Sequence, residues 1–395
     1  MKKTITFLLV LASIQNAFSQ TATSVQNGTW LNPTTWDCNC IPVMNYSVTI
    51  NNNVTLNTSM SFTSATSGIT INNGGSLLQD NGTRDILING GSFTNNGIFN
   101  TRYFYTQSSS NTGMNAGTMT LSAFTNSVVF ENHGNIIVDS LTNTSMFTNY
   151  GLLKVDSLTN TSTGEMENRG FLSTKWSTND GNFINEKHMD GIAHTNYGSF
   201  LNSDSLLLSQ GLWNANVFYN QIGYIHLGGG FYNYNHNTHT AVFDNVGQVI
   251  VLDSWYNTDT VKGSAGSFTV QDSSVNSGYM KDDFYFCDYS PINTNQVVDY
   301  NTGSISSQIT SCNLTDIEKY NQADFHFYPN PTNQILNIDC SALNETTEFQ
   351  ITDALGNSVK QFKIYNSQSK IDVADLNSGI YFIRIGNSTQ KFIKQ

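Results

Sequence analysis

The sequence predicts an all-β protein in which a parallel β-helix is followed by a small antiparallel β-sandwich. Three observations support this fold class. The chain of 395 residues is polar but sparsely charged, with 12% charged residues, 12% aromatic residues and 52 Asn. Its middle repeats a short motif containing Asn and Gly every 17 to 25 residues. Its last 70 residues lose this motif and show short alternating apolar and polar segments instead.

The composition also excludes two classes of function. The formal net charge is −12, from 17 Lys and Arg against 29 Asp and Glu. Because phosphate neutralisation needs cationic side chains, such a chain is a poor binder of nucleic acids and of anionic membrane surfaces. A hydrophobic content of 38% argues against wholesale disorder.

Residues 1–19 have the organisation of a secretory signal peptide. Lys2 and Lys3 precede a short apolar stretch, and Ala17 and Ser19 place small residues at the spacing of a cleavage site. The apolar stretch is shorter than the roughly 18 residues that a membrane span needs, and no later segment qualifies as transmembrane. We therefore expect an exported protein in a compartment where disulfides form.

Residues 20–49 are predicted to form an N-terminal cap, because the open strand edges at the end of a β-helix need cover. Trp30 and Trp36 are the expected core of this cap. The segment resembles the Trp-rich opening of β-helical surface proteins exported by Bacteroidota. Cys38 and Cys40 follow, but two cysteines alone are too few for a zinc site, which usually has four ligands.

The repeat is an apolar-x-Asn-x-Gly motif, complete at Phe93-x-Asn95-x-Gly97 and at Phe130-x-Asn132-x-Gly134. Its first positions lie at residues 50, 71, 93, 113, 130, 147, 166, 183, 200, 218, 243 and 268. Apolar residues six and eight positions later indicate a strand with one buried face. Units this short and this rich in Asn, Thr and Gly do not suit helical solenoids. Residues 50–285 are therefore predicted to form a parallel β-helix of about twelve coils.

Each motif position has an expected structural role. The Phe residues would stack into an internal aromatic ladder. The Asn would take a left-handed conformation, bond its own backbone and donate its amide to the Asn of the next coil. The Gly would supply a positive φ at the corner. The strict six-residue apolar period of left-handed hexapeptide helices is missing, which favours a right-handed coil.

Residues 286–323 are predicted to close the other end of the helix and to continue into a linker. The repeat ends after residue 280, and Cys287 and Cys312 bracket a polar loop, so we expect a disulfide between them. The chain has five cysteines, and the odd number leaves at least one thiol free or intermolecular.

Residues 324–395 are predicted to be a separate domain. From residue 325 onward six cationic and six acidic side chains cancel, whereas residues 20–324 carry nine Lys and Arg against 23 Asp and Glu, a net charge of −14. Short alternating segments such as 335–338 and 380–385 are separated by turn residues, which predicts a small antiparallel sandwich.

Three blocks of this domain carry a specific pattern, at 327–333, 351–359 and 391–394, with a fourth at 371–381. The residues that define the pattern are Tyr328, Pro329, Asn330, Pro331, Asp353, Gly356, Gly379, Tyr381, Lys391 and Lys394. In order and spacing these blocks resemble the type A C-terminal sorting domain of the type IX secretion system.

The resemblance implies a destination. In that family the domain is recognised by the secretion translocon and is commonly removed by a sortase-like peptidase. The released protein is then attached to surface lipopolysaccharide or shed. For this chain the resemblance implies export from a Bacteroidota cell, via the periplasm, to the outer cell surface or the medium, with cleavage before Phe325.

One group of side chains is a candidate for catalysis. Stacking of adjacent coils would bring Glu167 and Arg169 near Glu186 and His188, an acid–base cluster of the kind found in enzymes that act on polysaccharides. A solvated ion-pair face is the alternative interpretation.

A second group lies in the long coil that starts at Phe218. Tyr232 and Tyr234 could stack on sugar rings, and His236 and His239 could bind a metal weakly. A plain surface loop is the alternative, because insertions in solenoids protrude. We predict no metal site and no cofactor.

Taken together, the sequence predicts a secreted or surface-attached, non-enzymatic β-solenoid that is adhesin-like or structural. Extracellular glycans are candidate partners, although no residue pattern identifies the ligand. The alternative is a polysaccharide-active enzyme or a glycan-binding module on the same scaffold. Both interpretations rest on architecture rather than on a site.

Overall fold

The computed structural model describes residues 20–107, 111–236, 239–290, 296–312, 326–339, 347–364, 368–385 and 388–395. The predicted signal peptide, the linker at 313–323 and Cys340 lie outside these residues. The chain divides into two compact units, residues 1–314 and 315–395. The described residues are almost entirely β-strands, with one short 3₁₀ helix, η1 (Pro33–Thr35), so the all-β prediction is confirmed. Within these residues no helix is both long and apolar enough to cross a membrane.

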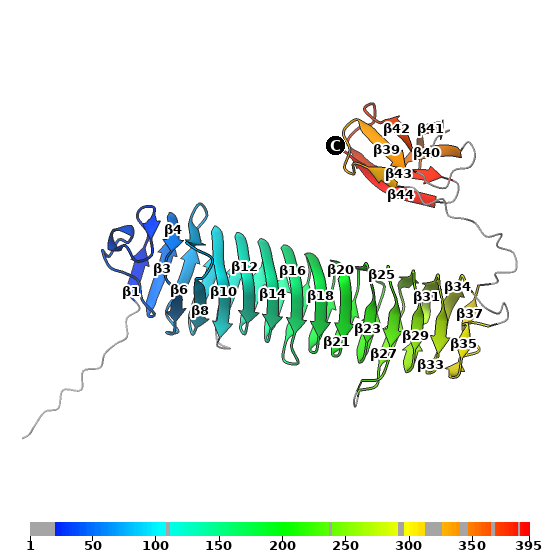
Figure 1. Cartoon of the computed structure of the whole chain (residues 1–395), viewed down its shortest axis with the longest axis horizontal. Helices are drawn as coiled ribbons and strands as arrows, with labels where there is room; N and C mark the ends of the chain where they lie inside the picture. The colour runs from blue at the N-terminus through cyan, green and yellow to red at the C-terminus, as the bar shows by residue number, and fades with distance from the viewer. Residues whose placement is uncertain are drawn as a thin grey trace, which may run out of the picture. The chain divides into compact units, whose positions relative to one another are not determined.

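The first unit is a parallel β-helix with three walls, and Figure 1 shows its coils in succession from β1 to β37. The first wall is a sheet of 15 parallel strands, in which inner strands pair with the strands one coil before and one coil after. These strands are β1 (Gln20–Thr23), β3 (Tyr46–Ile50), β6 (Gly68–Ile71), β9 (Ser92–Asn95), β11 (Thr112–Asn115), β13 (Val129–Asn132), β15 (Met146–Asn149), β17 (Glu165–Asn168), β19 (Asn182–Asn185), β21 (Ser199–Asn202), β24 (Val217–Asn220), β27 (Val242–Asn245), β30 (Thr260–Lys262), β33 (Tyr279–Met280) and β36 (Ser304–Ile305).

The second and third walls also pair in parallel from coil to coil. In six middle coils one long strand forms both walls: β10 (Ile98–Gln107), β12 (Thr118–Asn126), β14 (Asn135–Asn143), β16 (Leu152–Asn160), β18 (Phe171–Asn179) and β20 (His188–Asn196). Elsewhere the second wall consists of β2 (Gly28–Thr29), β4 (Asn53–Leu56), β7 (Ser76–Gln79), β22 (Ser205–Leu208), β25 (Tyr224–Leu227), β28 (Gln248–Val251), β31 (Ser264–Val270), β34 (Asp283–Asp288) and β37 (Thr310–Ser311). The third wall there consists of β5 (Met60–Phe62), β8 (Asp85–Asn89), β23 (Leu212–Asn214), β26 (Phe231–Asn233), β29 (Trp255–Asn257), β32 (Ser274–Asn276) and β35 (Tyr300–Asn301).

The predicted number of coils is confirmed, but the limits of the solenoid are wider than predicted. Twelve strands of the first wall, β6 to β33, lie within residues 50–285. Strands β1 and β3 belong to the predicted cap, and β36 lies beyond the predicted end. The prediction that the repeat ends after residue 280 is wrong, because parallel stacking continues to Ser311. The right-handed coil stays a prediction.

The last predicted motif position is also wrong. Phe268 pairs with Val249 in the second wall rather than with Phe243 in the first. The residues that continue the Phe243 position are Val261 and Met280. The sequence concealed this register because Gly263, two residues after Val261, stands at the position of the motif Asn.

Register differs at the beginning of the repeat as well. Ile69, and not Ile71, pairs with Phe93, so Ile71 occupies the position of the motif Asn. A longer turn then restores the stack, because Gly75 lies directly against Gly97. The motif therefore begins at the coil of Phe93.

The predicted internal aromatic ladder is confirmed. Ring centroids of neighbouring Phe residues lie 4.6 to 5.4 Å apart in four pairs: Phe130 and Phe147, Phe183 and Phe200, Phe200 and Phe218, and Phe218 and Phe243. These rings are fully or almost fully buried, and each contributes about 1.5–3 kcal/mol by burial. Gly113 interrupts the ladder because a Cβ there would lie 2.3 Å from the ring of Phe130.

The motif Asn residues form a continuous buried ladder, as predicted. In each step the side-chain Nδ2 donates to Oδ1 of the Asn one coil on, over 2.7 to 2.9 Å. The members are Asn95, Asn115, Asn132, Asn149, Asn168, Asn185, Asn202, Asn220 and Asn245. The predicted left-handed backbone is wrong, because these Asn have negative φ and end regular strands.

A second Asn ladder runs along the end of the third wall and was not predicted. Its steps are also Nδ2 to Oδ1 hydrogen bonds of 2.8 to 2.9 Å. The members are Asn126, Asn143, Asn160, Asn179, Asn196, Asn214, Asn233, Asn257, Asn276 and Asn301. Two of the three corners of the coil are thus closed by stacked amides.

The corner Gly residues are needed because there is no room for a Cβ, and not because of their backbone conformation. Gly117, Gly134 and Gly151 do not have the positive φ that was predicted. Instead, a Cβ on any of them would lie 2.1 Å from the carbonyl oxygen of the Gly one coil before. The Gly therefore allows two backbones to approach closely at the corner.

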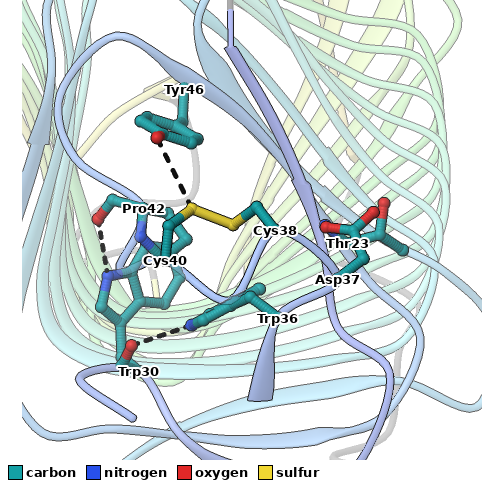
Figure 2. The surroundings of a disulfide bond; sticks show 8 residues. All are labelled: Thr23, Trp30, Trp36, Asp37, Cys38, Cys40, Pro42 and Tyr46. Atoms are coloured by element: carbon teal, nitrogen blue, oxygen red, sulfur yellow. Dashed lines mark hydrogen bonds between the residues drawn. A yellow bond between two sulfur atoms is a disulfide. The ribbon is translucent and has the colours of Figure 1, made fainter. Parts of the chain in front are cut away.

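The N-terminal end of the solenoid is covered by the two predicted tryptophans (Figure 2). Trp30 and Trp36 are buried with their rings in an edge contact at 5.0 Å. The indole of Trp36 donates to the carbonyl of Trp30, and the indole of Trp30 donates to the carbonyl of Pro42. Cys38 and Cys40 form a disulfide within the same loop.

The C-terminal end contains the predicted disulfide between Cys287 and Cys312. It joins β34 to the residue that follows β37. Four of the five cysteines are therefore paired.

The second unit is the predicted antiparallel sandwich. One sheet has the order β38 (His326–Tyr328), β39 (Ile335–Asp339), β42 (Gln368–Asp372). The other has the order β41 (Ser358–Ile364), β40 (Thr347–Asp353), β43 (Gly379–Ile385), β44 (Ser388–Lys394). Leu336 and Ile338 of the first sheet share one core with Phe349, Ile351 and Ile383 of the second.

Candidate functional site

The predicted acid–base cluster is an ion-pair network on the outside of the solenoid. Arg169 lies 2.7 Å from the carboxylate of Glu167 and 3.1 Å from that of Glu186, one coil on. The hydrogen bond with Glu167 is the main reason why the pKa of Arg169 is raised. Because both carboxylates are bound to the same guanidinium, the geometry is that of a surface salt bridge.

His188 does not join this network. Its ring stacks on Phe171 at 4.8 Å, Nδ1 lies 2.9 Å from the Ser205 hydroxyl, and Nε2 lies 3.4 Å from Asp190. The four predicted residues are therefore not one cluster.

A shallow groove of about 530 Å³ lies on the outer face of the first wall, beside Glu167. Two columns of outward-facing residues form it, with one residue from each strand. The apolar column contains Ile184, Leu201 and Tyr219, which pair in register on β19, β21 and β24.

The second column of the groove is polar. Glu165, Asn182 and Ser199 pair in register on β17, β19 and β21, next to the apolar column. Met146 extends this column, and Gln221 adds an amide near Tyr219. The lining includes two glutamates but, among the residues that the structure describes, no Lys or Arg.

The sequence did not single out these residues, apart from Glu167. The outward positions change identity from coil to coil, so they carry no periodic signal. Aligning the repeats on the motif Phe and reading the next residue gives Glu167, Ile184, Leu201 and Tyr219 in succession, which is the one signal that was available.

Of the second candidate group, Tyr232 lies in the third wall and not in the protruding loop. Its ring is stacked between those of Trp213 and Tyr256, at 5.3 and 5.4 Å and nearly parallel to both. Both ring faces are covered, so this ring offers no platform for a sugar.

Tyr234 and His236 begin the loop and pack on Tyr197. Burial, followed by a hydrogen bond with Tyr197, raises the pKa of Tyr234 to about 12. The His236 ring lies 4.9 Å from that of Tyr197, and the backbone of His239 donates to the carbonyl of His236. Across the described parts of the chain, no three side chains of metal-ligating type come together.

The sorting-pattern residues all lie in the second unit. The first block, 327–333, contacts the last block, 391–394. The Asn330 side chain accepts from the backbone of Ile393 and donates to the carbonyl of Lys391. Gly379 pairs with Lys394 between β43 and β44. Tyr328, Pro329 and Pro331 lie around Asn330 in the strand β38 and the turn after it.

The middle blocks shape two turns of the same unit. The Tyr381 hydroxyl donates to the carbonyl of Asn377, and its ring stacks on Phe392 at 5.6 Å. The Asp353 carboxylate accepts hydrogen bonds from the turn that contains Gly356, which has a positive φ of 85°.

Comparison with known families gives one match. The model of the secretion system C-terminal sorting domain matches residues 326–395, which contain all the described strands of the second unit. Comparison of the chain with curated proteins and with solved structures gives no match. The chain therefore carries a C-terminal sorting domain behind a parallel β-solenoid, and this domain supports its assignment as a substrate of the type IX secretion system.

Proposed function

We propose that the solenoid acts outside the cell as a non-enzymatic, adhesin-like protein, and that its contact surface is the groove on the first wall. The observation that carries this proposal is the pairing of an apolar column with a polar column across successive strands. Strands in such a stack are about 4.8 Å apart, so both columns are regular along the solenoid.

A glycan is the ligand class that suits this surface. A sugar ring presents an apolar face and a rim of hydroxyl groups, which match Ile184, Leu201 and Tyr219 on one side and Asn182 and Ser199 on the other. Exposed Tyr is a frequent partner in such contacts because one end of its ring is apolar and the other polar.

The negative charge of the groove and of the solenoid favours neutral glycans as the ligand class. The groove has Glu165 and Glu167 in its lining, and residues 20–324 carry a net charge of −14. Polyanionic polysaccharides would be repelled, and this repulsion would strengthen at low salt.

A glycan array with the purified chain tests the proposal. We expect binding to neutral glycans, with affinity reduced about tenfold or more by Tyr219→Ala, in the range of a binding hot spot. Tyr279→Ala is the matched control, because Tyr279 is an exposed Tyr on the same wall, in β33. Equal binding by the Tyr219 and Tyr279 variants, or no glycan binding at all, would show the groove to be unrelated to function.

The rival function is a polysaccharide-active enzyme, which is favoured by the two carboxylates in the groove. It predicts turnover on a polysaccharide panel that disappears in Glu167→Gln, and, if the wider cluster takes part, in Glu186→Gln or His188→Ala. Clear glycan binding without turnover would exclude this rival and support the adhesin-like function.

The proposal extends to the route and the final location. We propose passage through the periplasm, removal of the sorting domain by a sortase-like peptidase, and either attachment to surface lipopolysaccharide or release. Mass spectrometry of the extracellular protein tests this: a C-terminus near residue 324 is expected, and an intact residue 395 contradicts removal.

A further inference from the structure

The turn between β40 and β41 presents one apolar side chain to solvent. Leu355 is 88% exposed, more than any other large hydrophobic residue in the described chain. Its neighbours in the turn, Ala354 and Gly356, add no charge. Displaying a leucine in this way costs free energy, because apolar surface is favourably removed from water.

The backbone of the turn is held in place by hydrogen bonds that converge on Asp353. Its Oδ1 accepts from the backbone N–H groups of Leu355 and Asn357, both at 2.9 Å, and its Oδ2 accepts from the side-chain amide of Asn357 at 2.9 Å. In the backbone, the N–H of Asp353 donates to the carbonyl of Asn357 and the N–H of Gly356 donates to the carbonyl of Asp353, both at 3.0 Å. These bonds engage both carboxylate oxygens of Asp353 within the turn itself.

The hydrogen-bonded backbone distinguishes the position of Leu355 from that of a residue in an open loop. A turn whose backbone is already ordered loses less conformational entropy when a partner covers its tip. Gly356, with its φ of 85°, permits the tight conformation that places Leu355 at the tip. The turn thus presents one apolar side chain on an ordered backbone.

We propose that Leu355 is a docking anchor of the sorting domain, and that it inserts into an apolar pocket of the secretion machinery that receives this domain. The identity of the partner follows from the family match, since residues 326–395 form the part of the chain that the secretion machinery handles. The pocket must be apolar, because the tip of the turn offers a leucine between an alanine and a glycine. The proposal rests on the sorting role of this domain.

Export of the full chain from a type IX-competent cell tests the proposal. Leu355→Asp is expected to lower the extracellular protein at least about tenfold, in line with loss of a hot spot, while Leu355→Met keeps export. Ile222→Asp is the matched control, because Ile222 is 80% exposed in a turn of the solenoid. Asp353→Ala, which frees the turn but keeps Leu355, is expected to give an intermediate loss.

The design separates failure of the anchor from failure of the sorting role. If deletion of residues 325–395 leaves export intact, the sorting role itself is absent. If that deletion blocks export but Leu355→Asp is exported normally, the anchor is wrong. Equal retention of Leu355→Asp and Ile222→Asp also overturns the anchor. Thermal unfolding of each variant controls for folding, and if only Leu355→Asp unfolds, normal export of Leu355→Ala decides against the proposal.

Discussion

His194 is a fully buried histidine inside the solenoid, where its neighbours in the same column are leucine, serine and leucine. Its ring packs against Phe200 at 4.7 Å, and Nδ1 lies 2.7 Å from the hydroxyl of Ser177. Nε2 has no hydrogen-bond partner in the part of the chain that the structure describes. Burial therefore lowers the pKa of His194 from 6.5 to about 3.

This residue makes the stability of the solenoid depend on pH. Between pH 6.5 and about 3 the unfolded chain binds a proton at His194 that the folded chain does not, so stability falls as pH falls, by up to about 1.4 kcal/mol per pH unit. Above pH 6.5 the contribution is fully present. We expect denaturant unfolding to show a loss of about 2 kcal/mol from this group between pH 7 and pH 5.

His194→Leu, which matches the column, is expected to reduce that pH dependence. His133→Gln is the control, because His133 is exposed and paired with Glu131. The same pH slope in the wild type and in His194→Leu would rule out His194 as its source.

At the scale of the elements, the Asn ladders hold the coils together at two corners. Asn149 is representative: it accepts from Asn132, and its Nδ2 contacts Asn168, Gly151 and a carbonyl of the next coil. Asn149 is fully buried, so none of these polar groups can hydrogen-bond to water instead. Adjacent coils therefore depend on each other through the ladder as well as through strand pairing.

Asn149→Ala is expected to lower the free energy of unfolding by about 2–4 kcal/mol, because it leaves the amide of Asn132 and backbone carbonyls unsatisfied. Asn149→Asp should cost more, since a carboxylate cannot donate and would be charged when buried. Asn135→Ala, at an exposed position, serves as the control and should change stability by less than about 0.5 kcal/mol. Similar values for the Asn149 and Asn135 variants would contradict a stabilising ladder.

The sequence could predict the coils, but not the second Asn ladder or the reason for the corner Gly. A Phe-x-Asn motif marks the coil because stacked positions face the same surroundings. The second ladder was missed because the residue two positions before its Asn varies from Leu141 to His194 to Trp255. At Gly134 the sequence cannot show whether Gly is required for a positive φ or for lack of room for a Cβ, since Gly meets both requirements.

The groove was not predicted, for a different reason. Binding surfaces on a solenoid use outward positions, which are free to differ in every coil. The predicted register was correct in the coils that form the groove, but the outward residues of those coils share no residue type that would mark them as a site. In the sorting domain, by contrast, the motif residues could be named from the resemblance to a known family, and the structure shows that Asp353 and Gly356 shape a turn.

At the scale of the whole molecule, the solenoid has nearest-neighbour architecture, and each end is tied by a disulfide. Cys287 and Cys312 are separated by 25 positions in the sequence, and Cys38 and Cys40 by two. A loop of 25 residues corresponds to about 3.5 kcal/mol of chain entropy, whereas the shorter one adds little by this route. Because a coil contacts only its neighbours, loss of either disulfide should be felt near that end.

The double variant Cys287→Ser/Cys312→Ser tests this locality. Hydrogen exchange is expected to show lost protection in β34 to β37, while β13 to β21 keep theirs, because many coils separate the two regions. Cys38→Ser/Cys40→Ser is the matched control and should affect only β1 to β4. Uniform loss of protection along all coils would mean that the solenoid unfolds as one unit, and that the disulfide stabilises the whole stack rather than its end.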